Sequence, residues 1–241
     1  MKKPAYAVYG VVSYLVSLGS FFYFAGWVSN NFVPKTVDSG TPPGTLQAFA
    51  WNTVLLTVYC FLHSIFARTS LKEKMRRYVP RTLERATYCL AFSILLVVFC
   101  LLWQPIPEPL IWQVTSQPAV AAIYGLFVLF WAAHFLAIYM IGYNEFFGLR
   151  QAWQGARGED YRPPPPVSER YYMAGHLLLV ASLMAIPWAT PTMSLGQLYF
   201  CVYVSVYIVI GAWLSSRDLG DMHAPLPEPA KAAGDAMEPA A

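Results

Sequence analysis

The chain has 241 residues, of which 57% are hydrophobic, 16% are aromatic and only 12% are charged, and its formal net charge is +3. Soluble globular proteins carry about 25% charged residues, so this composition excludes a disordered chain, a nucleic-acid binder with a basic surface and an ordinary cytosolic enzyme. The positive mean hydropathy of +0.43 favours an all-α fold, a polytopic bundle of helices embedded in a lipid bilayer.

Six stretches are apolar enough to cross a bilayer, whose hydrocarbon core of about 30 Å requires about 20 helical residues. They are residues 5–28, 46–67, 86–103, 120–141, 173–189 and 198–214. The last two are short and are separated by Pro187 and Pro191, which break helices, so we expect them to form a tight hairpin. Residues 1–218 are then one transmembrane domain. The tail, 219–241, is rich in Pro, Ala and acidic residues and is predicted to be disordered.

The distribution of basic residues predicts the orientation of these spans. Fifteen of the 16 Lys and Arg residues lie on one side of the predicted bundle, and only Lys35 lies on the other. Cytoplasmic segments carry an excess of Lys and Arg, so we expect both termini in the cytoplasm and the functional groups at the cytoplasmic face. Residues 70–79 have the pattern of an interfacial helix, or of a positively charged anchor for this topology.

The cysteines give no sign of a disulfide framework or a metal site. Cys60, Cys89, Cys100 and Cys201 lie singly in apolar runs, with no CxxC pair and no His-rich tract beside them. We therefore predict no bound metal. No Asp or Glu falls within the six predicted spans, which does not favour a transporter with a carboxylate relay.

Three histidines lie inside predicted spans, where ionisable groups are costly and often functional. His63, His134 and His176 all fall in the expected cytoplasmic half. A common depth is typical of a pocket that faces the cytoplasm. The alternative is that each histidine bonds a neighbouring helix.

Two further patterns precede and surround the last hairpin. Residues 163–166 are consecutive prolines, which form a stiff extended segment that either covers a pocket or only links two spans. Ser168 follows as an expected helix N-cap. The eight tryptophans fall mostly near span ends, which predicts an interfacial aromatic belt.

Several motifs together resemble one family of membrane enzymes. They include His63-Ser64, Glu84-Arg85 with Thr87-Tyr88, Phe147-Gly148-Leu149-Arg150-Gln151, and Arg217-Asp218-Leu219. The chain resembles the NnrU and isoprenylcysteine carboxyl methyltransferase superfamily, and within it most closely the bacterial methanethiol S-methyltransferases.

This resemblance implies transfer of a methyl group from S-adenosylmethionine to a small thiol at the cytoplasmic face of a bacterial inner membrane. It implies that His63, Glu145 and Arg150 surround the thiol. It also implies that the cofactor lies beside Arg170, His176, Arg217 and Asp218. The sulfonium of the cofactor is a cation that favours an aromatic face, which adds Tyr172 to this set.

The chain also departs from the family pattern near the expected cofactor site. The usual Arg-His-Pro is here Gly175-His176-Leu177, and two glutamates that usually precede Arg-Asp-Leu are Ser215 and Ser216. These changes remove charged groups. They leave a second interpretation open, in which a catalytically degenerate methyltransferase fold serves as an accessory or assembly subunit of a larger membrane complex.

Overall fold

The computed structural model describes residues 3–67, 74, 76–165 and 167–222, with the side chains of the last helix described as far as Trp213. Seven helices are described: α1 (Pro4–Val28), α2 (Thr45–Ala67), α4 (Glu84–Leu102), α5 (Gln117–Phe146), α6 (Leu149–Ala156), α7 (Glu169–Ala185) and α8 (Leu195–Met222). A 3-10 turn, η1 (Ile186–Trp188), and two strands, β1 (Leu110–Gln113) and β2 (Thr192–Ser194), complete the fold.

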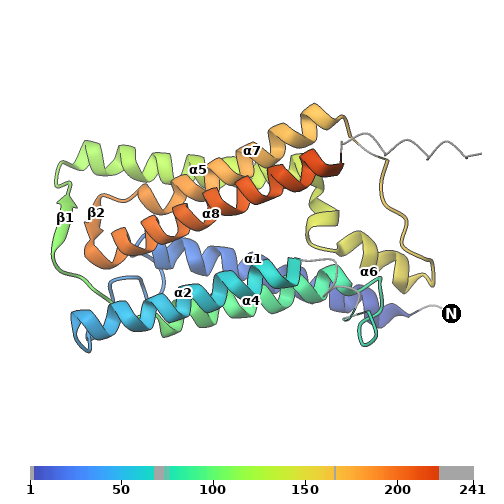
Figure 1. Ribbon diagram of the computed structural model, residues 1–241, viewed down its shortest axis with the longest axis horizontal. Coiled ribbons are helices and arrows are strands. Elements are labelled where there is room, and N and C mark those ends of the chain that lie inside the picture. Colours follow the sequence, from blue (N-terminus) through green and yellow to red (C-terminus); the bar gives the residue numbers. More distant parts are fainter. Residues whose placement is uncertain (1–2, 68–73, 75, 166, 223–241) are drawn as a thin grey trace, which may run out of the picture.

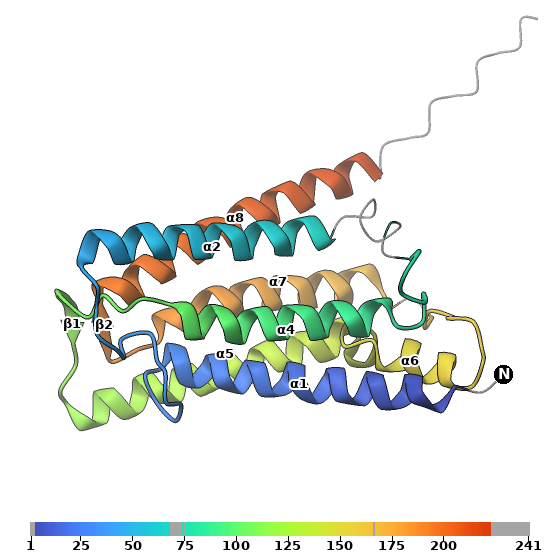
Figure 2. The same cartoon turned by 90° about the horizontal axis from the view of Figure 1, so that it is seen from below.

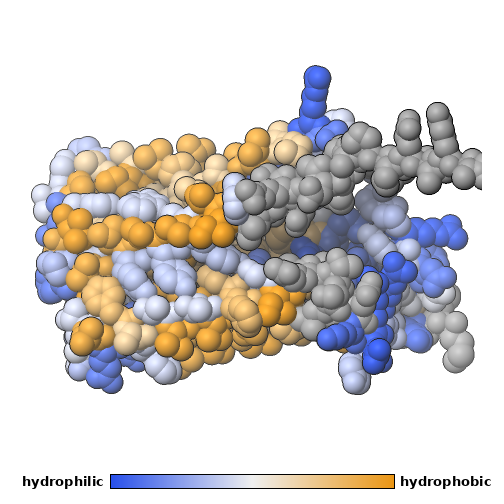
Figure 3. Space-filling view, in the orientation of Figure 1, coloured by the Kyte–Doolittle hydropathy of each residue, from blue (hydrophilic) through white to orange (hydrophobic). Residues whose placement is uncertain are grey.

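Six helical segments are long and apolar enough to cross a membrane, with α5 and α6 counted as one segment, which confirms the predicted all-α, multi-pass bundle. Apolar side chains cover the middle of the molecule and hydrophilic ones gather at its two ends (Figure 3). The chain breaks at η1 between the last two spans, as the prolines predict. Helix α8 continues to Met222, four residues past the expected domain boundary. Half of the predicted interfacial helix, residues 70–73 and 75 of 70–79, and the tail from 223 lie outside the described residues.

The spanning helices form two layers of three. Figure 1 shows α1, α2 and α4 in one layer and α5, α7 and α8 in the other. In the view turned by 90°, α1 and α5 lie at one side of the bundle and α2 and α8 at the other (Figure 2). The two ends of the bundle differ. We call the end that holds β1 and β2 the strand end. The opposite end, where α1 begins and α5 ends, is the basic end.

Small residues on α1 let it pack closely on its neighbours. Gly10, Ser13, Ser17 and Ser20 repeat at helical spacing, and the three serines are buried. A Cβ on Gly10 would come within 2.6 Å of a side-chain atom of α6. Ser93 of α4 donates a hydrogen bond to the Ser17 hydroxyl at 2.9 Å. Such close approach is how helices associate in lipid, where apolar burial gives little driving force.

An aromatic core joins the two layers near the strand end. Trp27 of α1 lies 5.1 Å from the ring of Phe200 on α8 and 5.6 Å from that of Trp103 on α4. Trp27 and Trp103 are fully buried, so the expectation of an interfacial belt is wrong for these two. Trp51 and Trp153 are half exposed, as a belt requires. Aromatic rings of this size contribute much of the buried apolar surface.

The strand end is closed by a small sheet and a half-buried carboxylate, neither of which we predicted. β1 and β2 pair antiparallel. Asp38, in the loop after α1, accepts hydrogen bonds from Ser194 and, at 2.8 Å, from Asn30. Burial raises the pKa of the Asp38 carboxyl, and these two hydrogen bonds oppose the rise. Gln197 is buried and donates to the carbonyl oxygen of Val28 at 3.0 Å, which ties α8 to the end of α1.

Two glycines shape the end of α5 at the basic end. Gly142 has a φ of +117° and interrupts the helix, and Gly148 has a φ of +74° in the turn before α6. L-residues with side chains rarely adopt such angles. A Cβ on Gly148 would also lie 2.5 Å from the backbone nitrogen of Ala86. The turn therefore seats the end of α5 directly on the start of α4.

Replacing Gly148 with Ala is expected to destabilise the fold, because the left-handed angle alone costs about 1–2 kcal/mol and the new methyl group meets the backbone of α4. Thermal unfolding in detergent measures the effect. Gly125→Ala is the matched control: a Cβ there meets nothing within 4 Å, so it should be neutral or slightly stabilising. Equal melting temperatures for both variants would contradict this account of the turn.

Candidate functional site

A cavity of about 120 Å³ lies between the two layers, among α1, α2, α4 and the end of α5. Its polar lining includes His63 of α2 and Arg85, Tyr88 and Cys89 of α4. Its apolar lining includes Phe21 and Phe92. Since a water molecule takes about 30 Å³ in the liquid, the cavity has the volume of about four waters.

His63 is oriented in this cavity by α8. Its Nδ1 lies 3.4 Å from the hydroxyl of Tyr207, which also contacts the Ser64 hydroxyl at 3.0 Å and donates to the carbonyl oxygen of Cys60. Rings of Phe92 and Tyr88 pack against the imidazole, with centroids 5.2 and 6.2 Å away. Among the described hydrogen bonds none uses His63 Nε2. That nitrogen is therefore the one available to a ligand.

Arg85 lines the same cavity, although sequence reasoning did not place it in the site. Its Nε donates to the carbonyl oxygen of Phe146 at 2.7 Å, and its guanidinium lies 5.2 Å from the ring centroids of Tyr88 and Phe146. In the sequence, the predicted topology already accounted for Arg85 as a basic residue at the start of an apolar helix, so it gave no separate sign of a site. The Glu84-Arg85 motif was the signal that could have identified it.

Glu145 and Arg150 form a second cluster beside the first. Arg150 Nε lies 3.4 Å from a Glu145 carboxylate oxygen, and Tyr161 donates to the other oxygen at 2.6 Å. Burial, and then the bond to Glu145, raise the pKa of the Tyr161 phenol, so it remains a donor at neutral pH. Glu145 is adjacent to Phe146, which lines the His63 cavity. Arg150 instead lines a separate surface cavity of about 440 Å³.

The segment before α7 is fastened to this second cluster. Besides the Tyr161 bond, the backbone nitrogen of Arg162 donates to the Gln154 side chain of α6 at 3.0 Å. Ser168 caps α7 as expected and accepts a hydrogen bond from the backbone nitrogen of Tyr171. Tyr161 and Arg162, which lead into the proline run, are thus hydrogen-bonded to the second cluster and to α6. This segment is therefore more than a linker between two spans.

The predicted cofactor residues lie apart from the cavity. Arg170, Tyr172 and His176 are exposed on the first two turns of α7, and the rings of Tyr172 and His176 are 5.1 Å apart. Arg217 and Asp218 belong to α8, but their side chains lie outside the described residues. In Figure 1, α7 and α2 belong to different layers of the bundle. No contact among the described residues joins this α7 cluster to His63.

The three membrane histidines have separate partners. His134 is buried, and its Nδ1 lies 3.3 Å from the hydroxyl of Ser182 on α7. His134 and His63 therefore each bond a neighbouring helix, which is the alternative to a common pocket. Across the described residues, no group of three or more His, Cys, Asp or Glu is placed to hold a metal ion.

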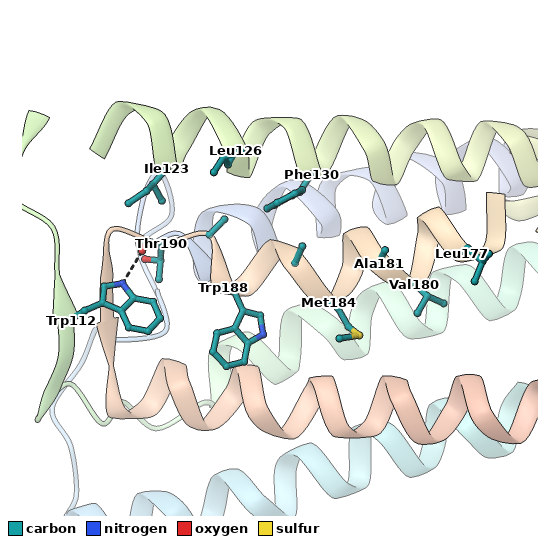
Figure 4. A pocket seen from close by; sticks show the side chains of 12 residues that line it. Trp112, Ile123, Leu126, Phe130, Leu177, Val180, Ala181, Met184, Trp188 and Thr190 are labelled. Carbon is teal, nitrogen blue, oxygen red and sulfur yellow. Dashed lines mark hydrogen bonds between the residues drawn. The ribbon is translucent and has the colours of Figure 1, made fainter. Parts of the chain in front are cut away.

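A larger cavity, about 830 Å³, lies between α5 and α7. Figure 4 shows Leu126 and Phe130 of α5 pointing toward α7, with Trp112 donating to the carbonyl oxygen of Thr190 at 3.1 Å. Its lining is almost entirely apolar and includes none of the predicted site residues. The smaller cavity has the more polar lining, with a histidine, an arginine, tyrosines and a cysteine.

Comparison with known proteins identifies relatives along nearly the whole chain. The chain is 39% identical over 223 residues to methanethiol S-methyltransferase of Pseudomonas deceptionensis, covering 90% of this chain and 82% of that protein. It is 36% identical over 220 residues to methanethiol S-methyltransferase of Mycobacterium tuberculosis, covering 91% and 89%. The chain belongs to the methanethiol S-methyltransferase family. This confirms the resemblance inferred from its motifs.

The methanethiol S-methyltransferase family has more distant relatives too. Nurim of Bos taurus is 23% identical over 236 residues, 90% of both chains. No protein-family profile and no solved structure matches the chain. The Phe147-Gly148 and Glu84-Arg85 motifs meet at the contact between α5 and α4.

Tyr161→Phe is expected to loosen the segment before the prolines, because it removes the hydrogen bond to Glu145. A bond to a charged group contributes about 1.5–3 kcal/mol, so local opening should rise about tenfold or more. Hydrogen exchange of the amides at 158–162 measures this. The control is Tyr171→Phe, whose exposed ring lies just beyond the segment. Unchanged exchange in Tyr161→Phe would show that the segment is held elsewhere.

Proposed function

We propose that the protein is a membrane methyltransferase that transfers a methyl group from S-adenosylmethionine to a small thiol of the methanethiol type. The reaction takes place at the cytoplasmic face of a bacterial inner membrane. The observation that carries this proposal is the small cavity in which His63 presents a free nitrogen beside Arg85. The family of named methanethiol S-methyltransferases supports the same reaction.

The acceptor class follows from the size and lining of the cavity. A volume of about 120 Å³ suits a thiol with few non-hydrogen atoms. Phe21 and Phe92 provide an apolar surface for an alkyl group. The imidazole of His63 and the guanidinium of Arg85 provide polar contacts for sulfur.

His63 acts as the general base. A thiolate is the reactive nucleophile, so the thiol must lose its proton before or during transfer. The Tyr207 hydroxyl donates to the Cys60 carbonyl, so in the reactive tautomer Nδ1 donates to Tyr207 and the unprotonated Nε2 accepts the thiol proton. A positioned base of this kind contributes typically 10²–10⁴-fold in rate.

The start of α7 provides groups that fit the methyl donor. S-adenosylmethionine, when bound, supplies an electrophilic methyl group on a sulfonium. The Arg170 guanidinium suits its carboxylate, and the adjacent rings of Tyr172 and His176 suit an adenine or a sulfonium. All three side chains are accessible. By the family pattern, Arg217 and Asp218 complete this set.

The orientation is inferred from charge. The His63 cavity and the α7 cluster lie at the basic end, together with Arg81, Arg157 and Arg162. Because cytoplasmic segments are enriched in Lys and Arg, this end faces the cytoplasm.

His63→Gln is expected to lower methyl transfer by about 10²-fold or more, because the general base is lost. The assay combines the detergent-purified protein with S-adenosylmethionine and methanethiol, and dimethyl sulfide is measured by headspace gas chromatography. Phe61→Leu, an exposed position two residues earlier on α2, serves as the control. Absence of dimethyl sulfide from the folded, unmodified protein would overturn the proposed function.

Calorimetric binding of S-adenosylmethionine tests the α7 cluster separately from chemistry. His176→Ala and Arg170→Gln should each weaken binding about tenfold, as expected for the loss of a charged or polar contact. His63→Gln and the exposed Arg157→Gln should bind as the unmodified protein does. A folded protein that binds no S-adenosylmethionine would instead favour the accessory-subunit interpretation.

A further inference from the structure

Arg85 is a cation that lines the His63 cavity and forms no ion pair with a described residue. No carboxylate of the described residues lines this cavity. The nearest acidic neighbour in sequence, Glu84, pairs with Arg76 at 2.8 Å. The other ion pair among the described residues joins Arg150 to Glu145. Neither pair includes Arg85.

The guanidinium also retains unused donors. Of its five N–H groups, the described hydrogen bonds use only Nε, which donates to the carbonyl oxygen of Phe146. The other close neighbours are the ring faces of Tyr88 and Phe146. Rings and a carbonyl stabilise a partly buried cation only in part, and a charge away from water is stabilised best by an opposite charge. The cavity is therefore built to receive an anion.

We propose that Arg85 is a catalytic residue that binds the thiolate sulfur of the acceptor. This inference rests on the proposed function and deepens it. The thiol proton passes to His63 Nε2, and the remaining electron pair on sulfur is held by the guanidinium. The new carbon–sulfur bond then forms as the methyl–sulfonium bond breaks, so an anion and a cation become two neutral sulfides. The proton leaves from His63 to solvent.

A purely structural role for Arg85, as the tie between α4 and the end of α5, makes a different prediction. Loss of the tie would lower kcat by the same factor at every pH. Loss of the positive charge would make the bound thiol harder to deprotonate, because a cation within about 4–6 Å lowers the pKa of an acid by about 1–3 units. The pH dependence of kcat, which reports the enzyme–substrate complex, separates the two roles.

The experiment measures kcat against pH for the full-length chain in detergent, with saturating S-adenosylmethionine and methanethiol. Arg85→Gln should move the acidic limb upward by about one pH unit or more and lower kcat at neutral pH about tenfold or more. Arg85→Lys keeps the charge and should keep the limb close to its original position. Arg81→Gln, an exposed basic residue just before α4, is the matched control and should change neither.

A second measurement does not depend on the stability of a variant. Azide, a small linear anion, should inhibit the unmodified enzyme competitively with methanethiol, and Arg85→Lys should retain that inhibition. Three results would each overturn the role of Arg85. The acidic limb could stay in place in Arg85→Gln, or it could move as far in Arg85→Lys as in Arg85→Gln. The third is that azide does not inhibit the unmodified enzyme. An unmodified protein that forms no dimethyl sulfide would instead overturn the proposed function itself.

Discussion

The seating of the end of α5 on the start of α4 fixes the geometry of the basic end. Arg85 donates from Nε to the carbonyl oxygen of Phe146 at 2.7 Å, and Cys89 donates to the same oxygen at 3.2 Å. Gly148 allows this approach because no side chain separates the two backbones. The contact joins the two layers of the bundle at the basic end. It also places Phe146 in the His63 cavity and Glu145 immediately beside it.

The space between the two layers is filled differently at the two ends of the bundle. At the strand end, large rings such as Trp27 and Phe200 fill the space between the layers, and the Asp38 network closes the loops over them. At the basic end the space between the layers is lined by polar groups and remains a cavity. Close packing of rings stabilises a fold but leaves no room for a ligand, and the cavity with the polar lining lies at the basic end.

A row of hydroxyl contacts between α2 and α8 positions the proposed base. The tyrosines at 199, 203 and 207, spaced one turn apart on α8, contact Thr53, Thr57 and Ser64 of α2 at 2.7, 2.8 and 3.0 Å. Polar contacts between membrane helices have few competitors in lipid, which makes such a row effective in fixing their register. The last tyrosine also contacts His63, so the pairing of α2 with α8 orients the imidazole.

Properties that depend on the hydropathy or the motifs of residues adjacent in the chain could be predicted from the sequence. Runs of apolar residues predicted all six spans, Pro187 and Pro191 predicted the break before α8, and motifs predicted the family. Only the tertiary structure decided which side chains meet across the layers. It buried Trp27 in the core, gave His134 a structural partner, brought Arg85 to His63, and left His176 apart from both. These outcomes depend on the packing of helices distant in sequence, and hydropathy contains no information about which helix faces which.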